Sequence, residues 1–248
     1  PFESLDCYTK TFRDMLRGGT RVLGFQGATV NNAIKWLLHC DFRKTDKRCE
    51  ILTNLFSNAR VIKVRSPGGT QISAHLGKRP VANDPGKVEK PGDENYLPAA
   101  CVNIAPLEDS WEGIAVFDAL VSPPVGLVKN PVTVEVEKGR ITKISGKEEA
   151  RHFEDWLNSF EDENMFRPCH VGSGVNPDFK EFTGHKLTDE RISGAVIIGF
   201  GTNDLPCFGG TIRAKAHTDG LMKDASIYLD DEPILQDGKF VHPKFQEL

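Results

Sequence analysis

The stretch RVIKVRSPGGTQISAHL, residues 60–76, decides the fold class of this chain. Residues 61–64 are a short β-branched run that predicts one strand, and residues 70–76 alternate apolar and polar side chains, which is typical of a strand with one buried face. Between them the SPGG sequence of residues 66–69 favours a tight turn, because proline presets φ and glycine tolerates positive φ. The sequence therefore predicts a β-hairpin at this point.

The rest of the chain after the hairpin continues mostly in short strands. The runs that predict them lie at 101–106, 113–121, 132–137, 140–145, 196–201, 211–217 and 226–230. One helix is expected over 148–160, where Phe153, Trp156, Leu157 and Phe160 recur at helical spacing. Strands that meet in hairpins, without alternating helices, are typical of the α+β class. We therefore expect a β-rich body of mixed or antiparallel sheet.

The N-terminal part has a different pattern. Its predicted elements are a strand, a turn and two helices, at 21–26, Gly27, 31–38 and 44–57. We expect residues 1–57 to be a small α/β fragment, the end of an N-terminal domain, and residues 58–248 to form the β-rich metal-binding catalytic domain. The polar segment 78–95, rich in proline and glycine, is expected to be one long loop that serves as a lid, a binding loop or a disordered excursion.

Composition excludes several classes of partner. A chain of 248 residues that is 39% hydrophobic can bury a proper core, and its net charge of −4 comes with lysines and arginines spread along the sequence. We therefore expect no nucleic-acid partner and no membrane patch. No apolar run approaches the roughly 18 residues that span a bilayer, and the N-terminus lacks a signal-peptide pattern, so we expect a cytoplasmic protein. The six cysteines form no CxxC pair, which predicts reduced thiols.

Three residues form a candidate metal site. His217 and Asp219 are two positions apart, so on an extended strand they share a face and can bind one ion. His170 stands before the glycine-rich run 171–177, where we expect it to head a turn. Two imidazoles and one carboxylate are the ligand set of non-haem Fe(II) oxygenases. Cys169 is left out, because adjacent strand residues face opposite ways. From the residues alone, ordinary hydrogen-bonded histidines remain an alternative.

Several segments, colinear from about residue 50 to 235, resemble the thermophilic aminopeptidases of the aminopeptidase T type. They are residues 60–70, residues 104–113, residues 172–177, and His217-Thr218-Asp219 with Tyr228-Leu229-Asp230. The resemblance implies a relative of two-metal hydrolases, whose ions need several carboxylates and a histidine. Where that family has two glutamates and a histidine, this chain has the segment 99–101 (Ala-Ala-Cys), His170 and Ile197. Ligands for a second ion are therefore missing.

The remaining set is similar to that of the 2,5-dihydroxypyridine dioxygenases, relatives of these peptidases in which two histidines and one aspartate hold a single Fe(II). The resemblance implies Fe(II) on His170, His217 and Asp219, with O2 and a small hydroxylated aromatic or N-heteroaromatic ring as substrates. It also implies a homo-oligomer. His75, Glu108 and Glu112 are close to these segments along the sequence and are candidates for the catalytic acid or base, although each could be structural.

Two other interpretations stay open. The chain could be a metallo-aminopeptidase with Zn or Co, in which Glu108 or Glu112 supplies the missing carboxylate. It could also be a non-catalytic relative that kept the fold. The coherent set of three ligands favours the Fe(II) ring-cleaving dioxygenase.

Overall fold

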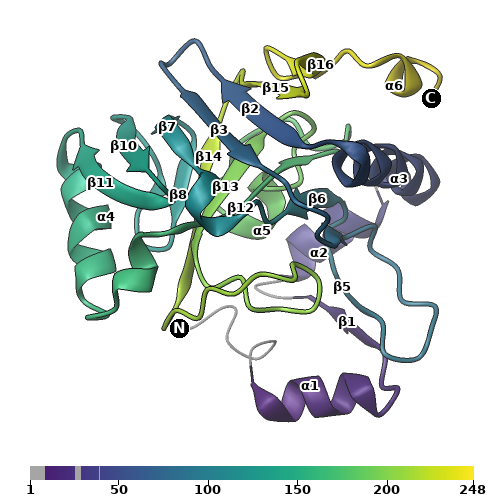
Figure 1. Ribbon diagram of the computed structural model, residues 1–248. Coiled ribbons are helices and arrows are strands. Elements are labelled where there is room, and N and C mark those ends of the chain that lie inside the picture. Colours follow the sequence, from purple (N-terminus) through teal and green to yellow (C-terminus); the bar gives the residue numbers. More distant parts are fainter. Residues whose placement is uncertain (1–8, 26–28, 39) are drawn as a thin grey trace.

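The hairpin expected at residues 60–76 is present in the computed structural model, which describes residues 9–25, 29–38 and 40–248 (Figure 1). It pairs β2 (Val61–Arg65) with β3 (Gln71–His75) in antiparallel register. Alternate side chains of both strands are buried, as the apolar pattern requires. The hairpin lies in the middle of the larger of two sheets.

The strands form two large sheets in which every pairing is antiparallel. The eight-stranded sheet has the order β11 (Arg140–Ser145), β10 (Val132–Glu137), β7 (Glu112–Phe117), β3, β2, β15 (Ser226–Leu229), β16 (Glu232–Gln236) and β17 (Lys239–Phe240). The seven-stranded sheet has the order β4 (Val81–Asn83), β6 (Cys101–Ile104), β12 (Pro168–Gly174), β13 (Val196–Gly201), β14 (His217–Met222), β8 (Leu120–Ser122) and β9 (Gly126–Leu127).

Helices pack against both large sheets (Figure 1). The helices are α1 (Lys10–Arg17), α2 (Val30–Leu38), α3 (Phe42–Asn58), α4 (Glu148–Asn158), α5 (Lys186–Asp189) and α6 (Pro243–Gln246), with short 3-10 turns η2 (Glu108–Ser110) and η3 (Glu163–Phe166). Helix α4 packs against β10 and β11, and α3 packs against β4 and β6. None of the helices in the described ranges is long and apolar enough to cross a bilayer. The α+β class expected from the sequence is confirmed.

One hydrophobic core joins the two sheets. Phe200 of β13 meets Phe117 of β7 edge-on at 5.8 Å between ring centroids, and Phe153 of α4 lies 6.0 Å away on the same ring. The buried face of α3, with Leu52 and Phe56, belongs to the same core. Burial of Phe153 explains the helical spacing seen in the sequence of α4.

The N-terminal part is connected to the body by a short parallel pair. β1 (Val22–Gly24) pairs with β5 (Glu94–Tyr96), which lies in the segment expected to be one long loop. That segment also contains β4, so the loop interpretation was wrong in part. The turn expected at Gly27 lies outside the described residues. The domain boundary after residue 57 stays a prediction.

Two strand predictions were wrong. Residues 113–121, expected as one strand, divide into β7 and β8, which belong to different sheets and are separated by Asp118 and Ala119. Residues 211–216, expected as a strand ending at His217, belong to a loop, and β14 starts at His217. The loop folds on itself, because the Ile212 amide donates to the side chain of Asn203.

Candidate metal centre

Three adjacent strands position the metal-binding candidates. His170 on β12 and Asp219 on β14 are both register partners of Gly199 on the strand between them, β13. His217 pairs with Gly201 in the same register. His170 therefore lies inside a strand, and the expectation that it heads a turn was wrong. The antiparallel order of these strands places the three side chains side by side.

The ligand atoms of the three residues form a tight triangle. His170 Nε2 lies 2.9 Å from Asp219 Oδ1, His217 Nε2 lies 3.2 Å from the same oxygen, and the two Nε2 atoms are 3.2 Å apart. Ligands about 2.1 Å from one ion at right angles are separated by about 3 Å, so the triangle fits one face of a single metal ion. All three side chains are at most 8% exposed.

Gly199 leaves the space that such an ion needs. A Cβ at this position would lie 2.2 Å from His170 Nε2 and 2.9 Å from Asp219 Oδ1. Any larger residue would therefore push its side chain into the triangle. The sequence signal was a glycine inside a buried strand, which often marks a close approach.

Burial and nearby charges set the protonation states of the triangle. Burial lowers the pKa of His170, which favours the neutral imidazole that coordinates metals. Burial alone would raise the pKa of Asp219, but Lys186 and the two histidines hold it well below its usual range. Lys186 Nζ contacts Asp219 Oδ2 and lies 3.6 Å from Glu190 Oε1. Asp219 is therefore an ionised carboxylate whose two oxygens face different partners.

Cys169 lies closer to the site than the sequence argument allowed. A register shift between Pro168 and His170 forms a bulge at Cys169, which breaks the strict alternation of strand side chains. Its Sγ is 3.6 Å from His217 Nδ1, and Cys169, His170 and His217 each offer a ligand atom within 4.8 Å of the others. However, this contact involves Nδ1 of His217, whereas Nε2 of that ring faces His170 and Asp219. The thiol, whose pKa is raised by burial, therefore contacts the ring rather than completing the triangle.

Phe208 covers one face of the His170 ring. Its ring stacks on His170 with 5.1 Å between centroids and 8° between planes. Phe208 lies in the loop of residues 202–216, which is tied to β12 where Asn203 Nδ2 donates to Cys169 O at 3.1 Å. Neither Phe208 nor Lys186 was found by sequence reasoning, because Phe208 lies in a loop and Lys186 begins α5, a four-residue helix that is too short to give a periodic signal.

The three acid and base candidates are placed differently. Glu108 accepts hydrogen bonds from Arg79 at 2.8 and 2.6 Å and from the Thr211 amide at 2.9 Å. Glu112 accepts from the Lys138 amide, and His75 is exposed at the end of β3. None of these contacts involves His170, His217 or Asp219. Glu108 instead holds the loop that carries Phe208.

The family to which known proteins assign this chain agrees with the geometry of the site. The model of the NicX family, described as 2,5-dihydroxypyridine 5,6-dioxygenase, matches residues 5–242. The chain belongs to this family. The similarity to the 2,5-dihydroxypyridine dioxygenases that the sequence indicated is therefore confirmed.

Individual NicX relatives and structures agree with this assignment. The chain is 30% identical over 199 residues to a 2,5-dihydroxypyridine 5,6-dioxygenase of Pseudomonas putida KT2440, a match that covers 77% of this chain and 57% of the relative. The chain thus spans little more than half the length of that relative. A solved 2,5-dihydroxypyridine dioxygenase from Pseudomonas putida KT2440 superposes with a TM-score of 0.84 at 27% identity, covering 96% of this chain and 70% of that one.

The aminopeptidase resemblance extends to the fold. AmpT from Thermus thermophilus matches with a TM-score of 0.62 and 16% identity, over 86% of this chain and 59% of that chain. At this identity the match shows a shared fold and no shared activity.

Proposed function

We propose that this chain carries the metal centre of a dioxygenase that cleaves the ring of a hydroxypyridine, with Fe(II) held by His170, His217 and Asp219. The observation that carries the proposal is the triangle of Nε2, Nε2 and Oδ1 atoms beside Gly199. Membership of the NicX family supports the substrate class. The activity belongs to relatives that are longer than this chain, so it is assigned here as a proposal.

The composition of the triangle supports Fe(II). Two imidazoles and one carboxylate leave the remaining positions of the ion open, which is the arrangement of Fe(II) oxygenases, whereas Mg²⁺ and Mn²⁺ prefer oxygen ligands. Ile197 on β13 and Ala100 are buried and offer no ligand atoms. Lys186 covers the second oxygen of Asp219. These features favour one ion over the pair that an aminopeptidase would need.

The surrounding residues would prepare the site for this chemistry. When bound, Fe(II) supplies a redox-active Lewis acid through which an electron-rich ring and O2 can react. Lys186 holds Asp219 in its ionised form, and Phe208 keeps water from one side of His170. Cys169 lies against Nδ1 of His217 and restricts rotation of that ring. His75, Glu108 and Glu112 remain sequence-based proposals for the acid or base.

An assay on the Fe(II)-loaded protein tests the proposal. With 2,5-dihydroxypyridine as substrate we expect one O2 to be consumed for each ring opened. An oxygen electrode measures the O2 uptake, and the loss of the ring's absorbance measures ring opening. His217→Ala should abolish both signals, and His152→Ala, which changes an exposed histidine on α4, should leave them unchanged. Peptide hydrolysis with Zn or Co, and no O2 uptake, would instead support the aminopeptidase interpretation. The homo-oligomer and the cytoplasmic location stay predictions.

A further inference from the structure

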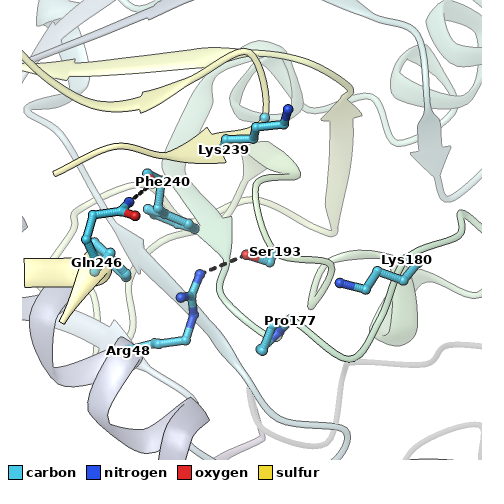
Figure 2. A pocket seen from close by; sticks show the side chains of 9 residues that line it. Arg48, Pro177, Lys180, Ser193, Lys239, Phe240 and Gln246 are labelled. Carbon is cyan, nitrogen blue, oxygen red and sulfur yellow. Dashed lines mark hydrogen bonds between the residues drawn. The ribbon is translucent and has the colours of Figure 1, made fainter. Parts of the chain in front are cut away.

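A cavity of about 370 Å³ lies away from the metal triangle, where α3, α6, β17 and the segment after β12 meet (Figure 2). Its lining consists of Arg48, Pro177, Lys180, Ser193, Gly238, Lys239, Phe240, Phe245 and Gln246. Three of these nine residues are cationic and none is acidic. The lining therefore has a strongly positive character.

Arg48 is fixed at the base of this cavity. It is 8% exposed, its Nε donates to Val175 O at 2.7 Å, and its Nη2 donates to Ser193 Oγ at 2.9 Å (Figure 2). Its guanidinium carbon lies 5.2 and 5.1 Å from the ring centroids of Phe240 and Phe245. Among the described residues these hydrogen bonds use Nε and Nη2, so Nη1 keeps two N–H groups to donate.

The charge of Arg48 has no counter-ion among the residues that the structure describes. Arg191, the other buried arginine in the described ranges, is paired with Glu190 at 2.7 Å and with Asp84 at 3.2 Å. Arg48 has no carboxylate within 4.0 Å among the described residues. Buried cations are almost always paired, because an uncompensated buried charge is costly. The Val175 carbonyl, the Ser193 hydroxyl and the rings of Phe240 and Phe245 offset only part of the charge of Arg48.

Other donors surround the same space. The Ser193 hydroxyl accepts from Arg48 and can donate its own proton into the cavity. The amino group of Lys180 points toward the cavity, whereas Lys239 lines it with its stem and carries its charge at the rim (Figure 2). Planar guanidinium groups match the geometry of carboxylate and phosphate oxygens. The donors and cationic groups around this space therefore suit an anion.

We propose that this cavity binds a small oxyanion, a phosphate or carboxylate group, with Arg48 as the anchor and Lys180 and Lys239 as the outer contacts. This site is separate from the metal triangle and does not depend on ring cleavage. Inorganic phosphate and maleate are suitable probes. Both present anionic oxygens, but one is a phosphate and the other carries carboxylate groups, and their shapes differ.

Calorimetric titration of each probe into the full chain tests the proposal. We expect saturable binding of at least one probe to one site per chain, and a rise in Tm of about 2 °C or more at saturation. The double variant Lys180→Ala/Lys239→Ala changes two exposed side chains and should weaken binding about tenfold or more while keeping the unliganded Tm. Preference for phosphate or for maleate identifies the source of the oxyanion.

A matched control separates this site from general attraction to a positive surface. Lys129→Ala/Lys143→Ala removes the same charge from exposed positions outside the lining and should leave binding unchanged. Arg48→Lys keeps the charge without the planar fork and should also weaken binding. Equal binding by both double variants, or no saturable binding by the wild-type chain, would overturn the proposal.

Discussion

Lys186 Nζ contacts Oδ2 of Asp219, while Oδ1 of the same carboxylate lies 2.9 Å from His170 Nε2 and 3.2 Å from His217 Nε2. The carboxylate is thereby divided between an ammonium group and the metal triangle. Burial lowers the pKa of Lys186, but Asp219 and Glu190 raise it above its usual value, so the group stays charged. An ion in the triangle therefore has one oxygen of Asp219 available.

Lys186→Met should change how many ions the chain binds. The substitution vacates a cation position that faces Asp219 Oδ2 and Glu190 Oε1, and two carboxylates around a vacant position attract a second divalent cation. We expect two Co²⁺ ions per chain in the variant and one in the wild type, measured by elemental analysis after equilibrium dialysis.

Lys186→Arg is the control for this change, because it keeps a positive charge at the same place and should bind one ion. If Lys186→Met also binds one ion, Lys186 does not limit the site to a single metal. Circular dichroism of each variant separates a change of stoichiometry from a loss of fold.

Gly199→Ala should abolish metal binding while β13 remains formed. Its φ lies outside the left-handed region, so the backbone accepts alanine, but the new Cβ would meet His170 Nε2 at 2.2 Å. We expect metal content below about a tenth of the wild-type value, because metal–ligand bonds of about 2 Å tolerate little displacement. Gly68→Ala, whose Cβ would meet its nearest neighbour at 3.6 Å, should retain the metal. Normal metal content in Gly199→Ala would show that the ion does not occupy this space.

The thermal stability of the protein at acidic pH should reveal whether ionised Glu108 stabilises the fold. Burial raises its pKa, but hydrogen bonds from Arg79 and from backbone amides outweigh burial and bring the pKa to about 2. The pKa of a glutamate in an unfolded chain is about 4.3. The hydrogen bonds to ionised Glu108 therefore stabilise the fold fully above that pH, and this stabilisation is lost as the pH falls through about 2.

Glu108→Gln should therefore lower Tm at pH 6, and the difference from wild type should shrink between pH 4.5 and pH 2. Differential scanning calorimetry at each pH measures this effect. Glu154→Gln, at an exposed position of α4, should show no such pH-dependent difference. A constant difference across this range would mean that ionisation of Glu108 does not stabilise the fold.

Local patterns predicted part of this structure. The hairpin of β2 and β3 depends on alternation and turn residues within one short segment, and the shared face of His217 and Asp219 depends only on strand geometry. Both features were visible in the sequence. His170 was identified from its motif, but its place inside β12 was missed, because glycines in the run after it suggested a turn.

The rest depends on contacts between distant segments. Gly199 matters because β13 lies between β12 and β14, and strand order is not written in any one segment. The bulge at Cys169 and the contact between Lys186 and Asp219 likewise arise from tertiary packing. Residues 211–216 have the composition of a strand, yet hydrogen bonds to Asn203 hold part of them in a loop. Tertiary context thus outweighs local propensity at the site itself.

Phe208→Ala should make the bound metal easier to remove. The ring of Phe208 stacks on His170 and is 8% exposed, so its removal opens a path for water and chelator to that ligand. We expect a chelator such as EDTA to extract the ion from the variant about tenfold faster than from the wild type. The absorbance of a Co²⁺-loaded sample measures this release. Phe208→Tyr keeps the stacked ring and should release the ion at the wild-type rate. Because the assay follows metal release rather than turnover, it does not depend on the substrate, and equal release rates in all three proteins would show that Phe208 does not shield the centre.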